Sequence, residues 1–204
     1  VLRPQVNQTW ETGGDFSYAS SKLNFSIFNT NSRDEIRYDP VTENNINDAD
    51  IQRVGVNFNE STQLNPKFNL GFGARYQRGV YSDGVNKGYL VSFVPQYLLN
   101  LRAKYQLSPQ LSLGGVINFV GSSYYDGDQQ NAYNKMSSYA FGDVYAQYRL
   151  QAWEARFTIR NVSNTQYAVY GNNQVSYSAP YGPYNYQPAP PRSFFISLRY
   201  NFDE

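Results

Sequence analysis

The amino-acid sequence predicts an all-β fold, an antiparallel up-and-down transmembrane β-barrel of which this chain supplies about nine strands. Three observations lead to this prediction. Apolar and polar residues alternate along the strand segments, as they do where a strand has one apolar face. The connections between those segments are alternately short and long. Arg and Lys occur at strand centres on the polar face, where they suit a wet lumen and not a lipid surface.

The predicted strands are about 10 to 13 residues long, close to the roughly 9 to 11 residues that cross a tilted bilayer. They cover residues 5–17, 20–32, 50–60, 66–77, 95–106, 110–122, 138–150, 153–163 and 192–202. The last strand alternates most clearly. One face carries Phe194, Ile196, Leu198, Tyr200 and Phe202, and the other carries Ser193, Ser197, Arg199 and Asn201, with Phe195 as its apolar exception.

The connections predict how the strands are oriented. Short connections end at Ser20, Pro66, Pro109 and Ala152, and between them lie long polar segments at residues 33–49, 78–94, 123–137 and 164–191. Outer-membrane barrels have short periplasmic turns and long extracellular loops, so this alternation puts the C-terminus on the periplasmic side. Nine is an odd number for a closed antiparallel barrel, and we therefore expect further strands before Val1.

A soluble β-sandwich with one apolar face per strand is the alternative fold. The membrane barrel is favoured because the apolar faces begin or end in aromatic residues, as interfacial girdles require. These residues are Tyr76, Tyr97, Tyr105, Trp153, Tyr200 and Phe202. No run of apolar residues approaches the roughly 18 to 20 that a helical span needs.

The composition excludes several classes of function. The chain has no His and no Cys, which removes Ser-His and Cys-His catalytic pairs, imidazole metal sites and thiolate metal sites. With 17 basic and 16 acidic residues the net charge is +1, so no charge pattern for nucleic acid is present. We therefore expect neither an enzyme nor a resident cofactor.

Four segments, in the same order, resemble the C-terminal barrel region of TonB-dependent outer-membrane receptors. They are "LRPQVNQTWETGGDF" with Leu2, Pro4, Gln5, Glu11 and Gly13; "LNFSIFNTNSRDEI" with Phe28 and residues 34–36; "RNVSNTQYAVYG" with Asn161, Val162, Asn164 and Tyr167; and "PPRSFFISLRYNF" with Pro191 and Arg192. The family usually ends on the aromatic residue, whereas Asp203 and Glu204 follow Phe202 here.

The resemblance implies that residues 1–204 are the C-terminal part of one 22-stranded barrel, with the plug domain and the N-terminal strands outside this chain. It implies import of a siderophore-type ferric chelate across the outer membrane of a Gram-negative bacterium, with energy from TonB acting on the plug. It also implies contact with outer-membrane lipid and recognition of Tyr200 and Phe202 by the outer-membrane assembly machinery. The absence of His argues against haem as cargo.

Other functions remain open at this point. The cargo of a TonB-dependent receptor can be a non-iron metabolite such as a vitamin or cofactor. The chain can also be part of a passive outer-membrane pore, or a soluble lectin rich in tyrosine. A TonB-dependent receptor differs from a passive pore by a plug domain before Val1. A soluble lectin differs from both because it needs no detergent.

Tyrosines of the long loops are the candidate ligand contacts, because a tyrosine ring offers a flat apolar face and a hydroxyl at small entropic cost. The candidates are Tyr124, Tyr125, Tyr133, Tyr170, Tyr177, Tyr181, Tyr184 and Tyr186. The alternative is that these loops are ordered and pack on themselves. Asn47, Asp48, Asp50 and residues 126–128 offer oxygen ligands without the spacing of an EF-hand, so no metal site is predicted.

Basic residues of the predicted lumen form a second candidate set. Arg75, Arg102, Arg156 and Arg160 lie on polar strand faces, where they can attract an anionic ferric chelate. The alternative is that they pair with carboxylates of the plug or of neighbouring strands. "GFGARYQRG", which contains Arg75, lacks the lysine and the helix of a phosphate-binding loop and is predicted to be a strand.

Overall fold

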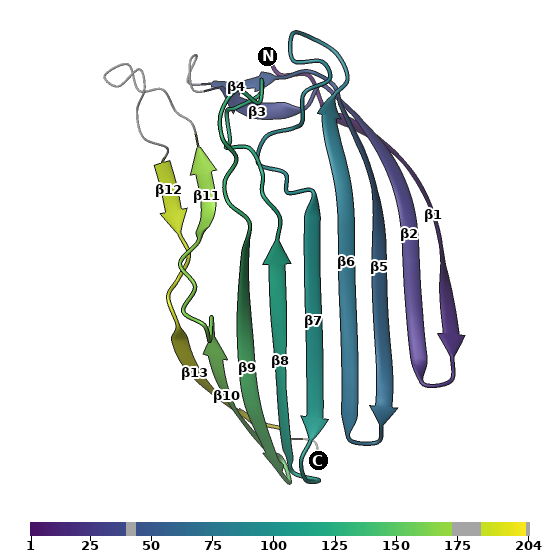
Figure 1. Ribbon diagram of the computed structural model, residues 1–204, viewed down its shortest axis with the longest axis vertical. Helices are drawn as coiled ribbons and strands as arrows, with labels where there is room; N and C mark the ends of the chain where they lie inside the picture. Colours follow the sequence, from purple (N-terminus) through teal and green to yellow (C-terminus); the bar gives the residue numbers. More distant parts are fainter. Residues whose placement is uncertain (40–43, 173–184, 203–204) are drawn as a thin grey trace.

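The computed structural model describes residues 1–39, 44–172 and 185–202. Its main element is one antiparallel sheet of nine strands, shown in Figure 1. In spatial order the strands are β1 (Val6–Tyr18), β2 (Ser21–Arg33), β5 (Ile51–Asn65), β6 (Phe68–Tyr81), β7 (Tyr97–Gln106), β8 (Leu111–Val120), β9 (Tyr139–Leu150), β10 (Trp153–Arg160) and β13 (Ser193–Tyr200). The prediction of an all-β antiparallel fold is confirmed. Within the described ranges, no helix is long and apolar enough to cross a membrane.

Two short hairpins lie inside long connections for which the sequence predicted no strands. β3 (Ile36–Asp39) pairs with β4 (Asn44–Asn47), and β11 (Ala168–Asn172) pairs with β12 (Asn185–Pro188). Both hairpins are at the end of the sheet where the long loops gather (Figure 1). We call this the loop end and the opposite end, with its short turns, the turn end.

β5 is longer than its predicted limit at residue 60, because pairing with β6 continues to the turn. Asn65 lies opposite Phe68, so the turn contains only Pro66 and Lys67. The Asn65 side chain accepts a hydrogen bond from the Lys67 N–H at 2.9 Å, which holds the turn closed. The polar residues at the end of this strand hid the alternation.

β10 is shorter than predicted and ends at Arg160, because Asn161 turns the chain. The φ angle of Asn161 is 49°, a left-handed value that Asn tolerates better than most residues. Its Nδ2 donates to the Thr165 carbonyl and its Oδ1 accepts from the Thr165 N–H, both at 2.9 Å. A local side-chain turn therefore replaces the sheet ladder at this point.

The register places aromatic residues in two bands on the apolar face of the sheet. Near the loop end, the rings of Tyr76 and Tyr97 are 5.2 Å apart, and near the turn end those of Trp153 and Tyr200 are 4.9 Å apart. Along β7, Tyr97 and Tyr105 are separated by eight residues, or about 26 Å of strand. A tilted strand of this length matches the apolar band of a membrane barrel.

One carboxylate interrupts the apolar face. Glu60 of β5 lies between Leu23 of β2 and Phe72 of β6 in the same row, and so projects from the face that carries the aromatic bands. Its Oε1 accepts a hydrogen bond from the Thr62 hydroxyl at 2.8 Å, and Thr62 is in turn 2.8 Å from the Ser21 hydroxyl. The polar group is therefore partly satisfied by its own strand and by β2.

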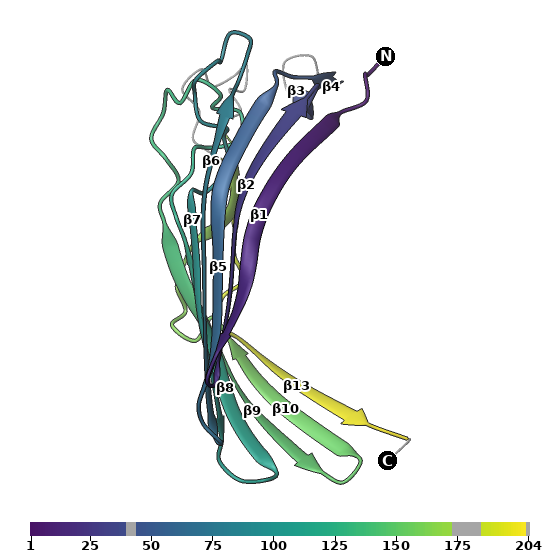
Figure 2. The ribbon, with the colours of Figure 1, turned by 90° about the vertical axis from the view of Figure 1, so that its right-hand side faces the viewer.

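The polar face of the sheet is concave. Figure 2 shows the sheet curving so that β1 and β13 turn toward the same side. A cavity of about 890 Å³ on this face is lined by residues from β5 through β13, and only a concave surface can bring strands so far apart in the sheet around one space. Within the described residues, β1 and β13 each pair with a single neighbour, so the sheet is open.

The packed core is at the loop end and not behind the sheet. Among the described residues, the buried apolar side chains are Ile51, Tyr81, Val91, Tyr125 and Met136. Ile51, Tyr81 and Val91 form one cluster at the loop-end termini of β5 and β6. The nine-stranded sheet, which we call the wall, is a single layer. Both of its faces are accessible to solvent, so almost none of its side chains are buried.

Candidate functional site

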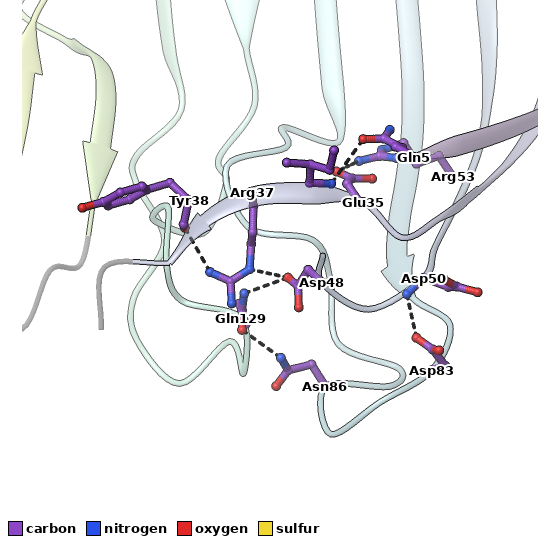
Figure 3. Close-up of polar contacts among 11 residues, drawn as sticks. Gln5, Glu35, Arg37, Tyr38, Asp48, Asp50, Arg53, Asp83, Asn86 and Gln129 are labelled. Atoms are coloured by element: carbon purple, nitrogen blue, oxygen red, sulfur yellow. Dashed lines mark hydrogen bonds and ion pairs between the residues drawn. The ribbon is translucent and has the colours of Figure 1, made fainter. Parts of the chain in front are cut away.

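Polar side chains join three of the long loops into one unit, which Figure 3 shows in close-up. Arg37 of β3 pairs with Asp48, which follows β4. Gln129 donates to Asp48 Oδ2 at 3.0 Å and accepts from the Asn86 side chain at 2.9 Å. The connection thus runs from the β3–β4 hairpin through the β8–β9 loop to the β6–β7 loop.

The β6–β7 and β8–β9 loops are also joined directly. The Asn131 side chain accepts from the Leu90 N–H at 2.8 Å and donates to the Leu90 carbonyl at 2.9 Å, as a neighbouring strand would. Asp128, whose exposure is 2%, accepts from the backbone N–H groups of Ala132 and Tyr133 at 2.8 and 3.1 Å. This buried carboxylate fixes the turn that presents Asn131.

Two further ion pairs hold the segment between β2 and β3, one with β5 and one with the residues that precede β1. Arg53 of β5 is 2.7 Å from Glu35, and Arg3 is 2.5 Å from Asp34. The acidic residues of this region are therefore used in protein contacts. Across the part of the chain that the structure describes, no group of three or more acidic side chains is arranged to hold a metal ion.

The β11–β12 hairpin is tied to the same loops through tyrosines. The Tyr170 hydroxyl donates to Asp126 at 2.5 Å, and the Asp126 N–H donates to the Gly171 carbonyl at 2.9 Å. The Tyr125 and Tyr186 hydroxyls are 2.7 Å apart. Burial, together with the hydrogen bond to Asp126, raises the pKa of Tyr170 above its usual value.

These contacts define what we call the loop cluster: residues 34–39, 44–50, 82–96, 121–138, 165–172 and 185–189. Of the tyrosines that the sequence nominated, the structure brings together Tyr125, Tyr170 and Tyr186, and Tyr124 has the Lys135 ammonium 4.8 Å from its ring centre. Tyr133 is 47% exposed at the edge of the cluster. The candidates Tyr177, Tyr181 and Tyr184 are outside the described residues.

An aromatic stack where the loop cluster meets β9 was not among the predicted ligand contacts. The rings of Tyr139 and Tyr167 are stacked at 4.3 Å, and Phe141 lies 5.2 Å from Tyr167. Tyr139 and Phe141 begin β9 on its polar face, where two successive aromatic residues are the signal that could have identified them. Burial raises the pKa of Tyr167 above its usual value.

A cavity of about 180 Å³ opens beside this stack. It lies between the β8–β9 loop, the start of β9 and the β11–β12 hairpin. The lining residues are Tyr125, Met136, Ser137, Ser138, Tyr139, Gln166, Tyr167, Ala168 and Tyr186. Gly171 allows this arrangement, because a Cβ there would lie 2.9 Å from the Tyr125 ring and 3.0 Å from the Met136 sulfur.

The large cavity on the concave face is basic. Arg102, Lys104, Arg156 and Arg160 line it, against one carboxylate, Asp143. Asp143 already accepts a hydrogen bond from the Asn161 N–H at 2.9 Å. Basic side chains therefore outnumber acidic ones in the lining of this cavity, and the excess positive charge favours an anionic occupant.

Two of these arginines are held by aromatic rings. The Arg156 guanidinium lies 3.7 Å from the centre of the Tyr145 ring, and that of Arg160 lies 4.5 Å from the Phe195 ring. The contact with Arg160 explains why Phe195 breaks the polar pattern of its strand. Arg75, the remaining basic candidate, lies on the polar face over Phe28, 5.1 Å from the ring centre, and does not line this cavity.

Comparisons with known proteins agree with this geometry. A family model described as "TonB dependent receptor-like, beta-barrel" matches residues 1–164. No curated protein matches. Similar solved structures include the ferric yersiniabactin uptake receptor FyuA from Yersinia pestis, at 20% identity and a TM-score of 0.79, over 97% of this chain and 30% of that one.

Two other solved structures have a similar fold. The copper transporter OprC is 14% identical with a TM-score of 0.77, over 99% of this chain and 32% of that one. The ferric-catecholate import receptor Fiu from E. coli is 18% identical with a TM-score of 0.72, over 98% of this chain and 28% of that one. The chain thus spans about a third or less of each of these proteins.

Proposed function

The chain belongs to the TonB-dependent receptor family of β-barrels, and from this premise we propose that it is the C-terminal part of the barrel of a receptor that imports a siderophore-type ferric chelate. Barrels of this family are outer-membrane proteins, and the family and its structural neighbours are transport receptors. The apolar face with its aromatic bands faces lipid, and the concave polar face is the interior.

One observation carries the proposal: a fixed, tyrosine-rich loop cluster stands at one end of a basic concave wall. Tyr124, Tyr125, Tyr133, Tyr170 and Tyr186 supply ring faces and hydroxyls for a bulky ligand arriving at the loop end. The wall below supplies Arg102, Arg156 and Arg160, which favour an anionic chelate. In this proposal the loop end is extracellular, and the turn end with the C-terminus is periplasmic.

The proposal includes partners outside this chain. The remainder of the receptor supplies the other strands and a plug inside the barrel, and TonB acts through that plug. Carboxylates of the plug can pair with the basic wall before cargo passes. Tyr200 and Phe202 are proposed as the aromatic signal for the outer-membrane assembly machinery; Asp203 and Glu204 lie outside the described residues.

The experiment is an uptake measurement on the complete receptor in iron-limited cells. Accumulation of labelled iron from ferric chelates should require the receptor and should stop when TonB is removed or the inner-membrane proton gradient is collapsed. Uptake of a vitamin or cofactor instead of ferric chelates would assign the receptor to the other cargo class. Uptake that continues without TonB would show a passive pore and overturn the proposal.

A further inference from the structure

We propose that the apolar face of the sheet carries a binding site for one anionic membrane lipid near the loop end. The acyl chain of the lipid lies in an apolar groove that crosses β1, β2, β5 and β6, and its phosphate is bound by Arg78 of β6. The inference goes beyond the proposed function, because it concerns the outer side of the barrel and not the cargo. The two proposals share only the orientation of the apolar face toward lipid.

Two arginines of the nine-stranded sheet project from the apolar face. Arg78 follows Tyr76 of the aromatic band by two residues on β6, and Arg33 is the last residue of β2, opposite Val6. Every other Lys and Arg of these strands projects from the polar face. Aromatic bands mark the level of the headgroups in a membrane, so both outward arginines lie near the level of lipid phosphates.

The protein itself does not use these two guanidinium groups. Among the described residues, Arg33 and Arg78 form no hydrogen bond, ion pair or ring contact, and both are exposed. By contrast Arg75, on the same strand as Arg78 but on the polar face, lies over the Phe28 ring. The donors of the two outward guanidinium groups are therefore available to a molecule outside the chain, and a phosphate oxygen is a favourable acceptor for them.

The groove beside Arg78 has room for an acyl chain. Its volume is about 510 Å³. An engineered protein cavity of about 150 Å³ holds benzene, so the groove offers about three times the space of a six-carbon ring. Its side walls come from two successive rows of the sheet, one with Trp10, Asn29 and Val54, and the other with Thr12, Ile27, Val56 and Tyr76.

Polar groups accompany the groove on its loop side. Arg78 continues the row of Trp10, Asn29 and Val54 by one strand, and Gln52 Nε2 donates to Asn29 Oδ1 at 3.4 Å. Arg78 and Asn29 are two strands apart, about 10 Å, which a phosphate and its ester group can span. Trp10, 69% exposed, stands at the far end of the row, in a position typical of the boundary between acyl chains and headgroups.

A second apolar groove on the same face lacks a basic end. Its volume is about 440 Å³, and Phe68, Tyr105 and Phe157 are among its lining residues toward the turn end. Along the described strands that line it, β6 to β10, no Lys or Arg projects from the apolar face near the turn end. Charge complementarity therefore favours the groove at the loop end for an anionic lipid, and sets it apart from a surface that contacts only acyl chains.

The test measures binding of dioleoyl phosphatidic acid to the complete receptor in detergent by native mass spectrometry. Dioleoyl phosphatidylcholine, which has no net charge, and inorganic phosphate, which has no acyl chain, are the comparison probes. We expect one saturable site for phosphatidic acid, with both comparison probes bound at least about tenfold more weakly. Strands outside this chain can bind lipid too, so the quantity compared is the occupancy that the variants change.

Arg78→Gln should weaken binding of phosphatidic acid about tenfold, because a hydrogen bond to a charged phosphate is lost. Val56→Trp, which fills the groove and leaves the charge in place, should weaken it to a similar extent. Arg33→Gln should weaken it only severalfold, because Arg33 is four residues farther along β2 than Asn29, about 13 Å. Arg75→Gln is the matched control: it removes a cation from the opposite face of the same strand and should leave lipid binding unchanged.

Equal binding of phosphatidic acid by folded Arg78→Gln and Arg75→Gln receptors would overturn the inference, with folding checked by heat-dependent migration on a gel. Equal affinity for phosphatidylcholine would also overturn it, because the groove would then not select an anionic headgroup. So would displacement of phosphatidic acid by inorganic phosphate at similar concentration, because the site would then bind free phosphate and not a lipid. None of these results bears on uptake of ferric chelates, so the transport proposal is tested separately.

Discussion

The loop end and the turn end of the sheet are built differently. At the turn end, connections as short as Gln151–Ala152 close the hairpins, and backbone hydrogen bonds pair the strands up to the turn. At the loop end, side chains such as Asp48, Asn131 and Tyr170 join segments that are far apart in the sequence. The wall is thus specified by alternation and backbone pairing, whereas the loop cluster depends on individual side chains.

The largest effect is expected from Asp48→Ala, which removes the carboxylate shared by Arg37 and Gln129. Hydrogen bonds to charged groups stabilise by about 1.5 to 3 kcal/mol, so local opening of the β3–β4 hairpin should become easier by about 2 kcal/mol. Amide hydrogen exchange of the complete receptor measures this opening.

An exposed ion pair at the turn end is the matched control. Arg149 lies 2.7 Å from Glu154, and its side chain is 63% exposed. Arg149→Met should cost only about 0.2 to 1 kcal/mol. Equal losses in the two variants would break the contrast between the two ends.

Asn131→Ala should free the β6–β7 loop from the β8–β9 loop. It removes both bonds to the Leu90 backbone and puts Ala at a φ of 52°. We expect a loss of about 1 to 2 kcal/mol in the opening free energy, seen as faster exchange of the Leu90 amide. Asn134→Ala, at an exposed position of the same loop, should leave that amide unchanged.

Glu60→Leu tests the wall, where the expected effect has the opposite sign. Glu60 projects from the apolar face between Leu23 and Phe72. The proposed function turns this face toward lipid, where acidic residues are destabilising. The variant should raise the free energy of unfolding of the complete receptor in lipid vesicles by about 1 kcal/mol. A loss of stability would mean that the hydrogen bond from Thr62 to this carboxylate outweighs the cost of placing a charge on the apolar face.

Among the loop-cluster variants, Tyr170→Phe should produce the smallest loss, about 1 kcal/mol, because it removes one hydrogen bond to Asp126 and keeps the ring. The raised pKa of Tyr170 also sets a pH dependence. The folded hairpin retains the phenolic proton when the released hairpin has lost it, so release is favoured as pH rises above about 10, the ordinary tyrosine value. In the wild type, the opening measured by hydrogen exchange near β11 should stay constant as pH varies around neutrality and become easier above about pH 10. In the Tyr170→Phe variant the change above about pH 10 should be smaller.

The contrast also explains how much the sequence could predict. Period-two alternation located the nine strands of the wall and assigned Arg102 and Arg156 to the polar face. It succeeds because successive side chains of any strand point to opposite faces of the sheet. Alternation carries no information about contacts between loops. Tyr139 stacks on Tyr167, 28 positions away, and Asn131 bonds to Leu90, 41 positions away. No local sequence pattern predicts such contacts.

The order of strands has a consequence for how the wall is assembled. Each strand of the nine-stranded sheet pairs with the wall strand that precedes it along the chain, with only the small hairpins intervening. Loop closure costs little for such neighbours, so the wall can grow one hairpin at a time from nuclei such as β5–β6. Each added hairpin also covers the exposed edge left by the last, which limits the time during which an edge can capture a foreign strand.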